Sequence, residues 1–395
     1  MKLDVVYHSS DLFAQVVAVS IVSLLENINN LVITVYLIDS NISETNKEYI
    51  KNIISKYNNV KLNIIPLPNL ESTYNIKFKQ VKKKWNVFDY ICRLYLGTIL
   101  PLSVEKVLYL DSDTLVLNSL EELIQIDLKD NYFAAVKDCL SEGYYDLLGL
   151  DKTSVYCNSG MMYFNLKKWR DEDVEKSISS FINKKKGYIF FMEQSVMNIV
   201  CQNRILILSP KYNVSTLMLY LSYKQIQTLR KSQRFYSELE LIDAVNNPHI
   251  VHLTGLFYIT SRPWYEGSKH PMANCYLFYR NKTLFKSLPL FVQNSLLKKM
   301  LSFIFNIVPK RITLPIAGFL YNKWRVYDAK KKMKKYDVVA LGELLIDFTE
   351  NGKSNQGNPL FEANPGGAPC NVLAMLTKLG HKTAFIGKVG EDFFG

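Results

Sequence analysis

The first hundred residues predict an α/β fold in which a mostly parallel sheet is covered by helices. Two kinds of segment alternate there, short apolar runs typical of buried strands and longer stretches with helical spacing. The strand-like runs are KLDVVYH, LVITVYLID and VKLNIIPL, and the helical stretches are AQVVAVSIVSLLEN, NKEYIKNIISKY and WNVFDYICRLYLGTIL. This alternation predicts a doubly wound sheet with a ligand-binding crevice at the carboxyl ends of its strands.

The predicted crevice lacks two common phosphate-binding motifs. No GxGxxG follows the first strand-like run, and no GxxxxGK[ST] occurs in the 395 residues. These motifs supply the glycines that let a backbone approach phosphates closely. Their absence argues against a dinucleotide-binding or P-loop protein.

Cysteine usage and apolar runs indicate the compartment. The six cysteines are scattered without a CxxC pair, and the first residues, MKLDVVYHSS, show no signal-peptide layout. No apolar run reaches the roughly 18 residues typical of a membrane span. We therefore expect a cytoplasmic protein with reduced thiols.

The net charge of +12 is concentrated near the C-terminus. Residues 280–335 contain fourteen Lys and Arg and one acid, Asp328, a local charge of +13 that leaves −1 for the rest of the chain. A neutral body with one basic segment favours an anionic surface over nucleic acid as a partner. Residues 290–308 within it have helical spacing, with one polar and one apolar face. The polar face carries Ser295, Lys298, Lys299, Ser302 and Asn306, and the apolar face carries Leu297, Met300, Leu301, Ile304 and Val308.

The stretch KVLYLDSDTLVL, residues 106–117, places two aspartates at the end of an apolar, strand-like run. A buried carboxylate is costly unless it is paired or bound to a cation. Asp111 and Asp113, one residue apart at a strand end, can share Mg²⁺ or Mn²⁺, which prefer oxygen ligands. The alternative is that DSD forms only a turn, because Asp-x-Asp alone is a weak signal. The buried run in front of it favours the metal.

This stretch resembles the metal-binding motif of glycosyltransferase family 8, retaining enzymes that use UDP-sugars. Five further segments resemble the same family in order, so that the match covers about residues 1–275. They are YHSSDLFAQVVAVSIVSLLEN, WNVFDYICRLYLGTILP, VYCNSGMMYFNLKKWR, FFMEQSVMN and HLTGLFYITSRPW. The resemblance implies a GT-A type nucleotide-sugar-binding fold, with a mixed, mostly parallel central sheet flanked by helices.

The resemblance also implies which residues contact the UDP-sugar. Phe13 stands where the family places an aromatic ring against uracil, and Leu12 replaces the usual asparagine beside it. Arg93 matches the arginine that reaches the nucleotide-sugar, and Arg262 replaces a lysine. The implied donor contacts are Ser10, Asp11, Phe13, Arg93, Asp111, Asp113, Asn158, Ser159, Gly160, Gly255 and Arg262.

The metal ligands that the resemblance implies are Asp111, Asp113 and His252, holding Mn²⁺ or Mg²⁺. Taken alone, His252 after an apolar run is more often a core or capping histidine. Glu193 and Gln194 alone fit a solvated helix start, and the tryptophans fit packing. The motifs favour the family reading jointly, because they occur in the order that one donor site requires.

The catalytic residues that the resemblance implies lie in FFMEQSVMN, where the family usually has Asp-Gln-Asp. Gln194 matches the amide beneath the anomeric carbon, and Glu193 would bond to the sugar hydroxyls. Ser195 replaces an aspartate found in some members, which excludes a covalent carboxylate intermediate there and favours front-side transfer. Asp138, in AAVKDC, matches an acid near the sugar.

Residues 333–395 resemble a different family, the ribokinase-like (PfkB) sugar kinases and especially fructokinases. The matching segments are YDVVALGELLIDF, NPGGAPCNVLAMLTKLG and GKVGEDFFG. Asp347, Gly366, Gly367 and Asn371 stand where such kinases contact their sugar. The late Gly-Ala-Gly-Asp segment with the catalytic aspartate has no counterpart, so we expect a truncated, fused fragment without kinase activity.

These observations predict three parts: a catalytic domain (1–275), a basic aromatic amphipathic tail (276–332) and a truncated kinase-like fragment (333–395). The predicted function is metal-dependent transfer of glucose or galactose from UDP-glucose or UDP-galactose to a glycan or glycolipid acceptor in cell-surface polysaccharide or lipopolysaccharide synthesis. The tail is expected to hold the enzyme peripherally at the inner face of the cell membrane. The alternatives are a sugar kinase and a non-catalytic scaffold; Leu12 and Ser195 favour the scaffold.

Overall fold

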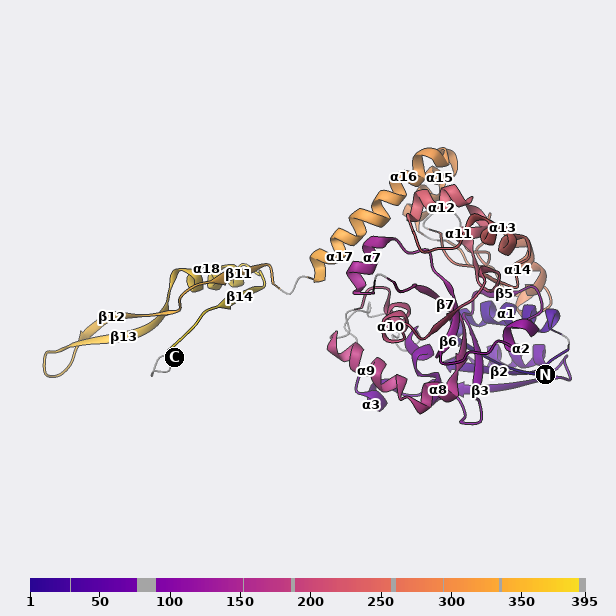
Figure 1. Cartoon of the computed structure of the whole chain (residues 1–395), viewed down its shortest axis with the longest axis horizontal. Helices are drawn as coiled ribbons and strands as arrows, with labels where there is room; N and C mark the ends of the chain where they lie inside the picture. Colours follow the sequence, from indigo (N-terminus) through magenta and orange to yellow (C-terminus); the bar gives the residue numbers. More distant parts are fainter. Residues whose placement is uncertain are drawn as a thin grey trace. The chain divides into compact units, whose positions relative to one another are not determined.

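The computed structural model describes residues 1–28, 30–76, 90–151, 153–185, 189–256, 261–293, 295–333 and 336–390. The chain divides into two compact units, Met1–Val326 and Tyr327–Gly395 (Figure 1). Parts of three predicted segments lie outside the described residues: 85–89 of the third expected helix, 257–260 of the last transferase-like motif and 391–395 of the kinase-like end.

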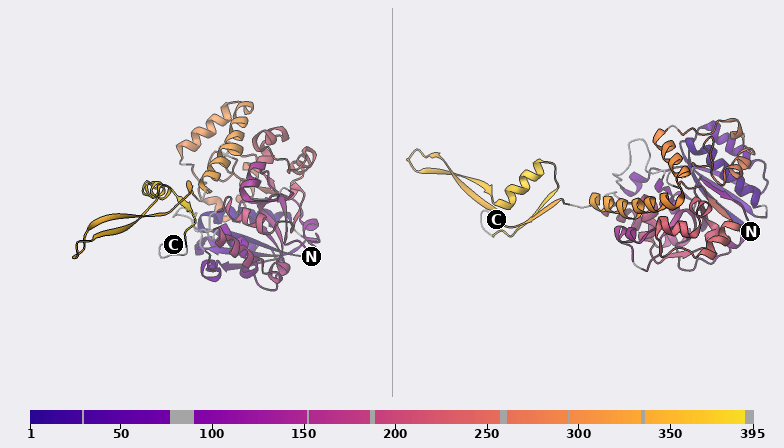
Figure 2. Two further views of the ribbon diagram at one scale, coloured as in Figure 1. Left: turned by 60° about the vertical axis from the view of Figure 1, so that its left-hand side comes forward. Right: turned by 90° about the horizontal axis from the view of Figure 1, so that it is seen from above.

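A seven-stranded sheet forms the centre of the first unit, with the order β3-β2-β1-β4-β7-β6-β8. Both views of Figure 2 show helices around the strands of this unit. Its strands are β1 (Lys2–Ser10), β2 (Val32–Ser40), β3 (Val60–Pro66), β4 (Lys106–Leu110), β6 (Phe133–Lys137), β7 (Cys157–Asn165) and β8 (Ile205–Ile207). Only β7 runs against its neighbours, and the other pairs are parallel. The predicted mixed, mostly parallel sheet is confirmed.

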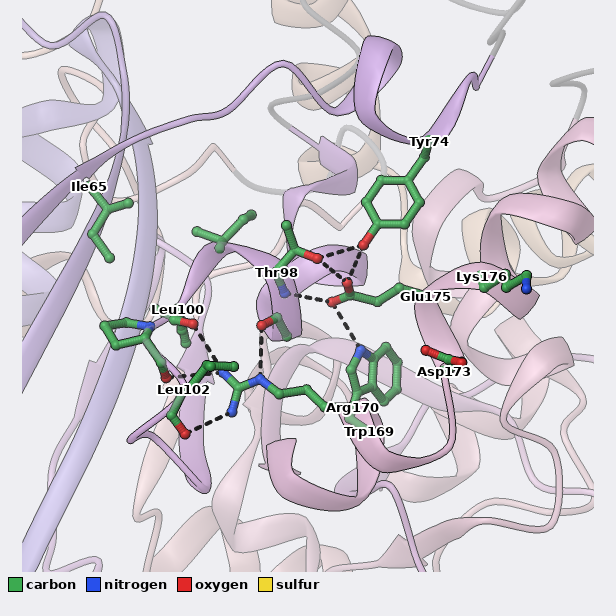
Figure 3. Close-up of a pocket in the computed structure, with 13 residues that line it drawn as sticks. Ile65, Tyr74, Thr98, Leu100, Leu102, Trp169, Arg170, Asp173, Glu175 and Lys176 are labelled. Atoms are coloured by element: carbon green, nitrogen blue, oxygen red, sulfur yellow. Dashed lines mark hydrogen bonds between the residues drawn. The ribbon is translucent and has the colours of Figure 1, made fainter.

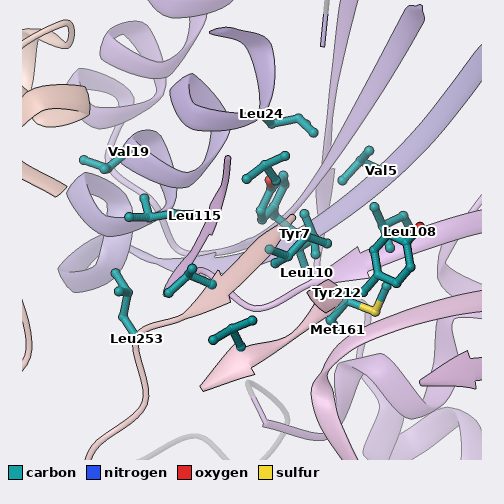
Figure 4. Close-up of a cluster of buried hydrophobic side chains, with 14 of the residues drawn as sticks. Val5, Tyr7, Val19, Leu24, Leu108, Leu110, Leu115, Met161, Tyr212 and Leu253 are labelled. Carbon is teal, nitrogen blue, oxygen red and sulfur yellow. The ribbon is translucent and has the colours of Figure 1, made fainter. Parts of the chain in front are cut away.

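Side chains of the sheet alternate between two buried clusters. Val5 and Tyr7 of β1 pack with Leu24 of α1 (Ala14–Asn27) on one face, which also holds residues of α2 (Glu44–Ile54) (Figure 4). Val6 faces the second cluster, which lies under η2, α5, α8, α9 and α10. Both faces are covered, as a parallel sheet requires. The bounds of the covering elements are η2 (Cys92–Tyr95), α5 (Leu96–Ile99), α8 (Leu166–Asp171), α9 (Val174–Lys184) and α10 (Met192–Val200).

A small second sheet lies beyond the end of β4, with the order β5-β10-β9. Its strands are β5 (Thr114–Val116), β9 (Val214–Ser215) and β10 (Ile250–His252). Antiparallel pairing of β10 with β5 places His252 opposite Thr114, directly after the two aspartates. The remaining elements before residue 290 are η1 (Asp11–Phe13), α3 (Leu70–Tyr74), α6 (Glu121–Ile124), α7 (Glu142–Leu148), η3 (Pro210–Tyr212), α11 (Thr216–Tyr220), α12 (Tyr223–Arg230), α13 (Glu238–Asn246), α14 (Ala273–Arg280) and η4 (Leu284–Ser287).

The basic segment ends the first unit as a run of helices. The helix predicted within 290–308 is α15 (Leu296–Ile307); α16 (Lys310–Phe319), a π-helical turn η5 (Leu320–Trp324) and α17 (Arg325–Met333) follow it (Figure 1). α16 packs closely on α12, because a Cβ on Gly318 would lie 2.7 Å from the carbonyl oxygen of Thr228. The segment as far as Val326 therefore belongs to the first unit. None of the helices in the described ranges combines the length and the apolar character needed to cross a membrane.

The second unit is a small assembly with little core of its own. β11 (Val338–Leu341) pairs in parallel with β14 (Thr383–Ile386), β12 (Leu345–Lys353) and β13 (Pro359–Gly366) form a hairpin, and α18 (Ala368–Lys378) follows. Leu341 is 80% exposed and Leu379 is 68% exposed, whereas Leu373 is buried. The unit therefore buries little apolar surface, and a unit of this size has little surface to bury in the first place.

We expect removal of residues 336–395 to leave the stability of the first unit unchanged, because the first unit is compact by itself. The main thermal transition of the shortened chain, followed by circular dichroism, should move by less than about 2 °C, which corresponds to well under 1 kcal/mol for a unit of this size. A larger fall would show that the second unit stabilises the first. Neither chain should phosphorylate fructose with ATP.

Candidate active site

Two arginines neutralise the aspartates that follow β4. Asp111 accepts a 3.0 Å hydrogen bond from the Tyr109 hydroxyl and forms a 2.8 Å ion pair with Arg93 Nη2. Arg93 is itself buried, and its Nη1 donates to the carbonyl oxygen of Ser159 at 2.9 Å. Asp113 forms an ion pair with Arg262. The carboxylates are thus held at a strand end by opposite charge, which offsets the cost of their burial.

His252 completes the cluster from the second sheet. Its Nε2 lies 3.2 Å from Asp113 Oδ1 and 3.7 Å from Asp111 Oδ2. Burial alone would lower the pKa of His252, but the two carboxylates outweigh burial and raise the pKa. Burial alone would likewise raise the pKa of Asp113, whereas His252 and Arg262 lower it. His252 therefore lies among charged groups and is more than a packed core histidine.

A glycine makes room for the imidazole. A Cβ on Gly160 would lie 2.1 Å from His252 Cε1, so any side chain at this position would displace the ring. The Gly160 carbonyl oxygen also accepts a 2.8 Å hydrogen bond from the backbone N–H of Asp111, just after the end of β4. The Asn-Ser-Gly segment of β7 therefore shapes the metal-binding side of the site.

The donor set fits a divalent cation. Asp111, Asp113 and His252 each offer one ligand atom, and these atoms lie within 4.8 Å of one another. Two carboxylate oxygens and one imidazole nitrogen suit Mn²⁺ or a similar first-row cation, and leave coordination positions for further oxygens. The predicted ligands are thus brought together, although Asp111 and His252 are 141 residues apart in the chain.

The predicted catalytic residues meet on the other side of β7. Gln194 Nε2 donates to Asp138 Oδ2 at 2.8 Å. Gln194 Oε1 accepts from the backbone N–H of Ser159 at 3.2 Å and from Asn158 Nδ2 at 3.3 Å. The amide is therefore oriented by partners from β7 and from the loop after β6.

Two buried asparagines that the sequence did not single out support this network. Asn198 accepts from the backbone N–H of Cys157 at 2.6 Å and donates to the carbonyl oxygens of Cys157 and Gln194, both at 2.8 Å, which fastens α10 to β7. Asn213 donates to Asn158 Oδ1 at 2.9 Å. Asn198 is the last residue of the FFMEQSVMN motif, so the motif could have identified it as a site residue. Asn213 lies in no such motif.

Glu193 and Ser195 differ in their surroundings although they flank the same amide. Burial raises the pKa of Glu193, and Arg93, 4.0 Å away, offsets only part of that effect. Ser195 is fully buried, and its Oγ lies 2.9 Å from the Tyr156 hydroxyl. Position 195 therefore contributes to the packing of α10 and presents no nucleophile.

The predicted uridine contacts lie at the ends of β1 and β10. Phe13 is partly exposed and packs edge-on against Trp264, with ring centroids 6.4 Å apart. The Asp11 carboxylate accepts from the backbone N–H of Ser43 at 2.8 Å, so it holds the start of α2 in this structure. Ser10 directly precedes η1, and Leu12 within η1 is exposed. Gly255 lies near Arg262, because a Cβ on this glycine would be 3.8 Å from Arg262 Nε.

A cavity of about 720 Å³ lies elsewhere, between α5, α8 and α9 (Figure 3). Two of its charged side chains are already paired: Glu175 accepts from the Tyr74 hydroxyl at 2.6 Å and from Trp169 Nε1 at 3.2 Å, and Arg170 donates to the carbonyl oxygens of Gly97 and Leu100. None of its lining residues is a predicted site residue. The cavity is a feature of the scaffold, and Trp169 is a packing residue.

A GT-A type sheet with two aspartates and a histidine, a candidate metal site, after one of its middle strands is typical of glycosyltransferases that use nucleotide-sugars. The sequence model of glycosyltransferase family 8 matches residues 4–266, and the chain belongs to this family. A galactosyltransferase, LgtC, crystallised with donor and acceptor sugar analogues, has the same fold, with a TM-score of 0.57, 23% identity, and coverage of 71% of this chain and 96% of that chain.

Two curated relatives support the family assignment. A Haemophilus influenzae protein assigned as a glycosyltransferase is 30% identical over 220 residues, which are 53% of this chain and 63% of that protein's length. A lipopolysaccharide 1,2-glucosyltransferase of Escherichia coli is 27% identical over 285 residues, 69% of this chain and 76% of that protein.

The second predicted resemblance is also confirmed. Residues 335–395 match the model of the pfkB family of carbohydrate kinases. A fructokinase of Solanum tuberosum is 52% identical over 60 residues, which are 15% of this chain and 19% of that protein. The chain therefore contains only a small part of such a kinase.

Proposed function

We propose that this family 8 glycosyltransferase transfers a hexose, glucose or galactose, from a UDP-sugar to a glycan acceptor with retention of configuration. The cluster of Asp111, Asp113 and His252 carries the proposal, because these ligands would join a divalent cation to the diphosphate of the donor. Relatives named as a lipopolysaccharide glucosyltransferase and a galactosyltransferase support either hexose and a cell-surface glycan as the product.

Each side of the site has a separate task in this proposal. A bound Mn²⁺ or Mg²⁺ would act as a Lewis acid toward the leaving diphosphate. Arg262 is partly exposed and can turn from Asp113 to a phosphate, for which its planar fork is suited. Arg93 is buried and holds Asp111 in place through their ion pair.

The sugar side favours front-side transfer. Gln194 would place its amide against the developing positive charge at the anomeric carbon, with Asp138 holding the amide nitrogen. Glu193 would bond to sugar hydroxyls. Ser195 is buried against Tyr156 and offers no carboxylate, so the leaving phosphate is left to help deprotonate the acceptor hydroxyl.

Transfer and hydrolysis of UDP-glucose and UDP-galactose should require Mn²⁺ or Mg²⁺ and stop when the cation is chelated. Asp111→Ala and Asp113→Ala should each keep the fold and retain less than about a tenth of the activity, which is roughly 1.4 kcal/mol in the barrier. Proton NMR of the first-formed product should show the α-configuration of the donor. Inverted product would contradict retention, and inactivity with every UDP-sugar would favour a non-catalytic scaffold.

Gln194→Ala should lower kcat and leave the affinity for UDP nearly unchanged, because the amide is assigned to the sugar side and acts mainly in the transition state. Single-turnover kinetics and calorimetric titration with UDP measure the two effects. Gln202→Ala, which changes an amide outside the donor site, is the matched control. Weaker UDP binding with normal turnover would show that Gln194 is misassigned.

We also propose that the helices after residue 295 bind an anionic membrane surface. Large apolar side chains on them are exposed and lie among lysines and arginines, and the only acid between residues 280 and 335 is Asp328. Insertion of apolar side chains together with about 1 kcal/mol per nearby cation supports peripheral binding. The exposed apolar residues are Leu296, Met300, Phe303, Ile304, Ile307, Ile312, Ile316, Phe319, Leu320 and Trp324.

The double substitution Phe303→Asp and Ile307→Asp should abolish sedimentation with vesicles of anionic phospholipid. Leu239→Asp, which changes an exposed apolar residue of α13, is the control and should leave binding intact. Binding of the parent chain should weaken at 1 M salt, where the Debye length is about 3 Å. If the double variant sediments as well as the parent does, this surface does not bind the membrane.

A further inference from the structure

The helix that carries Glu193 and Gln194 begins with a strained backbone. Phe191 and Met192 precede them with φ angles of 59° and 46°, in the left-handed region that non-glycine residues avoid. Such a conformation persists only where the surrounding structure enforces it. What holds these residues in place therefore also determines where Gln194 lies.

Aromatic packing enforces the turn. The Phe191 ring lies 5.2 Å from the Tyr144 ring and 4.5 Å from the Phe190 ring, measured between centroids. Tyr144 is fully buried and stacks on Phe190 at 5.6 Å. These contacts come from α7 and from the turn itself, and they leave one side of the group to be covered by another segment.

The C-terminal helices cover that side. The Tyr321 ring lies 5.0 Å from the Tyr144 ring, and the Tyr144 hydroxyl donates to the Tyr321 carbonyl oxygen at 2.8 Å. The Arg325 guanidinium lies 5.1 Å from the centroid of Phe191 and 5.2 Å from that of Phe190. The π-helical turn η5, which carries Tyr321, packs on α7. In Figure 1 the helix that follows it, α17, is labelled next to α7.

The C-terminal segment is also anchored to the body of the first unit. Asn322 Nδ2 donates to the carbonyl oxygen of Leu229 at 3.0 Å, and Gly318 allows the close approach of α16 to α12. Its position is therefore fixed independently of the strained turn, as a support requires.

We propose that Tyr321 and Arg325 are positioning residues for the transferase reaction, which hold the strained turn at Phe191 and thereby keep Gln194 in its catalytic position. The proposal extends the function proposed above and rests on it for its kinetic test. It also means that the basic segment, besides offering a surface to a membrane, is part of the catalytic unit.

The test uses the full chain with Tyr321→Ala and Tyr321→Phe. Tyr321→Ala should lower kcat about tenfold or more, as small misplacements of catalytic groups do, without weakening UDP binding, and Tyr321→Phe, which keeps the ring, should restore most of the rate. Tyr49→Ala, which removes a comparable ring packed on Phe285, is the control for general loss of packing and should leave kcat unchanged.

A double-mutant cycle distinguishes positioning from simple destabilisation. In a Gln194→Ala background, Tyr321→Ala should change kcat by less than about twofold, because the residue through which it acts is gone. Gly318→Val, which should push α16 away from α12, is expected to mimic Tyr321→Ala. An additive cycle, or an equal loss in Tyr49→Ala, would overturn the proposal.

A second measurement does not depend on activity. Hydrogen exchange of the peptide covering residues 189–200 should speed up in Tyr321→Ala and stay unchanged in Tyr49→Ala. Unchanged exchange of this peptide in Tyr321→Ala would overturn the proposal. If the parent chain shows no transfer or hydrolysis, the proposed function fails, and the exchange experiment still decides whether Tyr321 supports the turn.

Discussion

The pairing of two carboxylates with basic side chains at the end of the central strand is the constraint on which the site depends. Asp111 and Asp113 follow an almost fully buried strand, and Arg93, Arg262 and His252 converge on them. These three side chains come from η2, from the loop after β10 and from β10 itself. The packing of both sheets therefore serves to bring cationic groups to one strand end, and a single misplaced element would leave a buried charge unpaired.

The sequence predicted those features of the fold and the site that follow from local patterns and from the order of the motifs. The alternation of strand-like and helical segments gives the parallel part of the sheet, and the paired aspartates mark the carboxyl end of β4. The contacts of Tyr321 with Tyr144, and of Asn213 with Asn158, join positions far apart in the chain and leave no local signature. The sequence pattern of a basic amphipathic helix predicts a separate tail. Periodicity shows which face of the helix is apolar, but it does not show which segment packs against that face.

The two units differ in how well the sequence pattern agrees with the packing. In the first unit helices pack against both apolar faces of the large sheet, so the local pattern and the tertiary packing agree. In the second unit the motifs of a sugar kinase are present, yet apolar residues such as Leu341 and Leu379 are exposed. A motif match therefore identifies ancestry over 60 residues, while a function needs the rest of the fold.

The two arginines differ in how readily they can change partners. Arg93 is buried, bonds to Asp111 and to the backbone of Ser159, and has no solvent to replace either contact, so moving it would leave a carboxylate and a carbonyl group unpaired. Arg262 is 36% exposed and pairs with Asp113 from one side, beside the Trp264 ring, so water or a phosphate can replace the carboxylate at little cost. Under the proposed function, a donor diphosphate with its cation would offset the loss of this ion pair, because Asp113 would gain the cation as a partner and Arg262 would gain a phosphate. The buried pair of Arg93 and Asp111 would stay in place, so only the partly exposed pair of Arg262 and Asp113 would have to open.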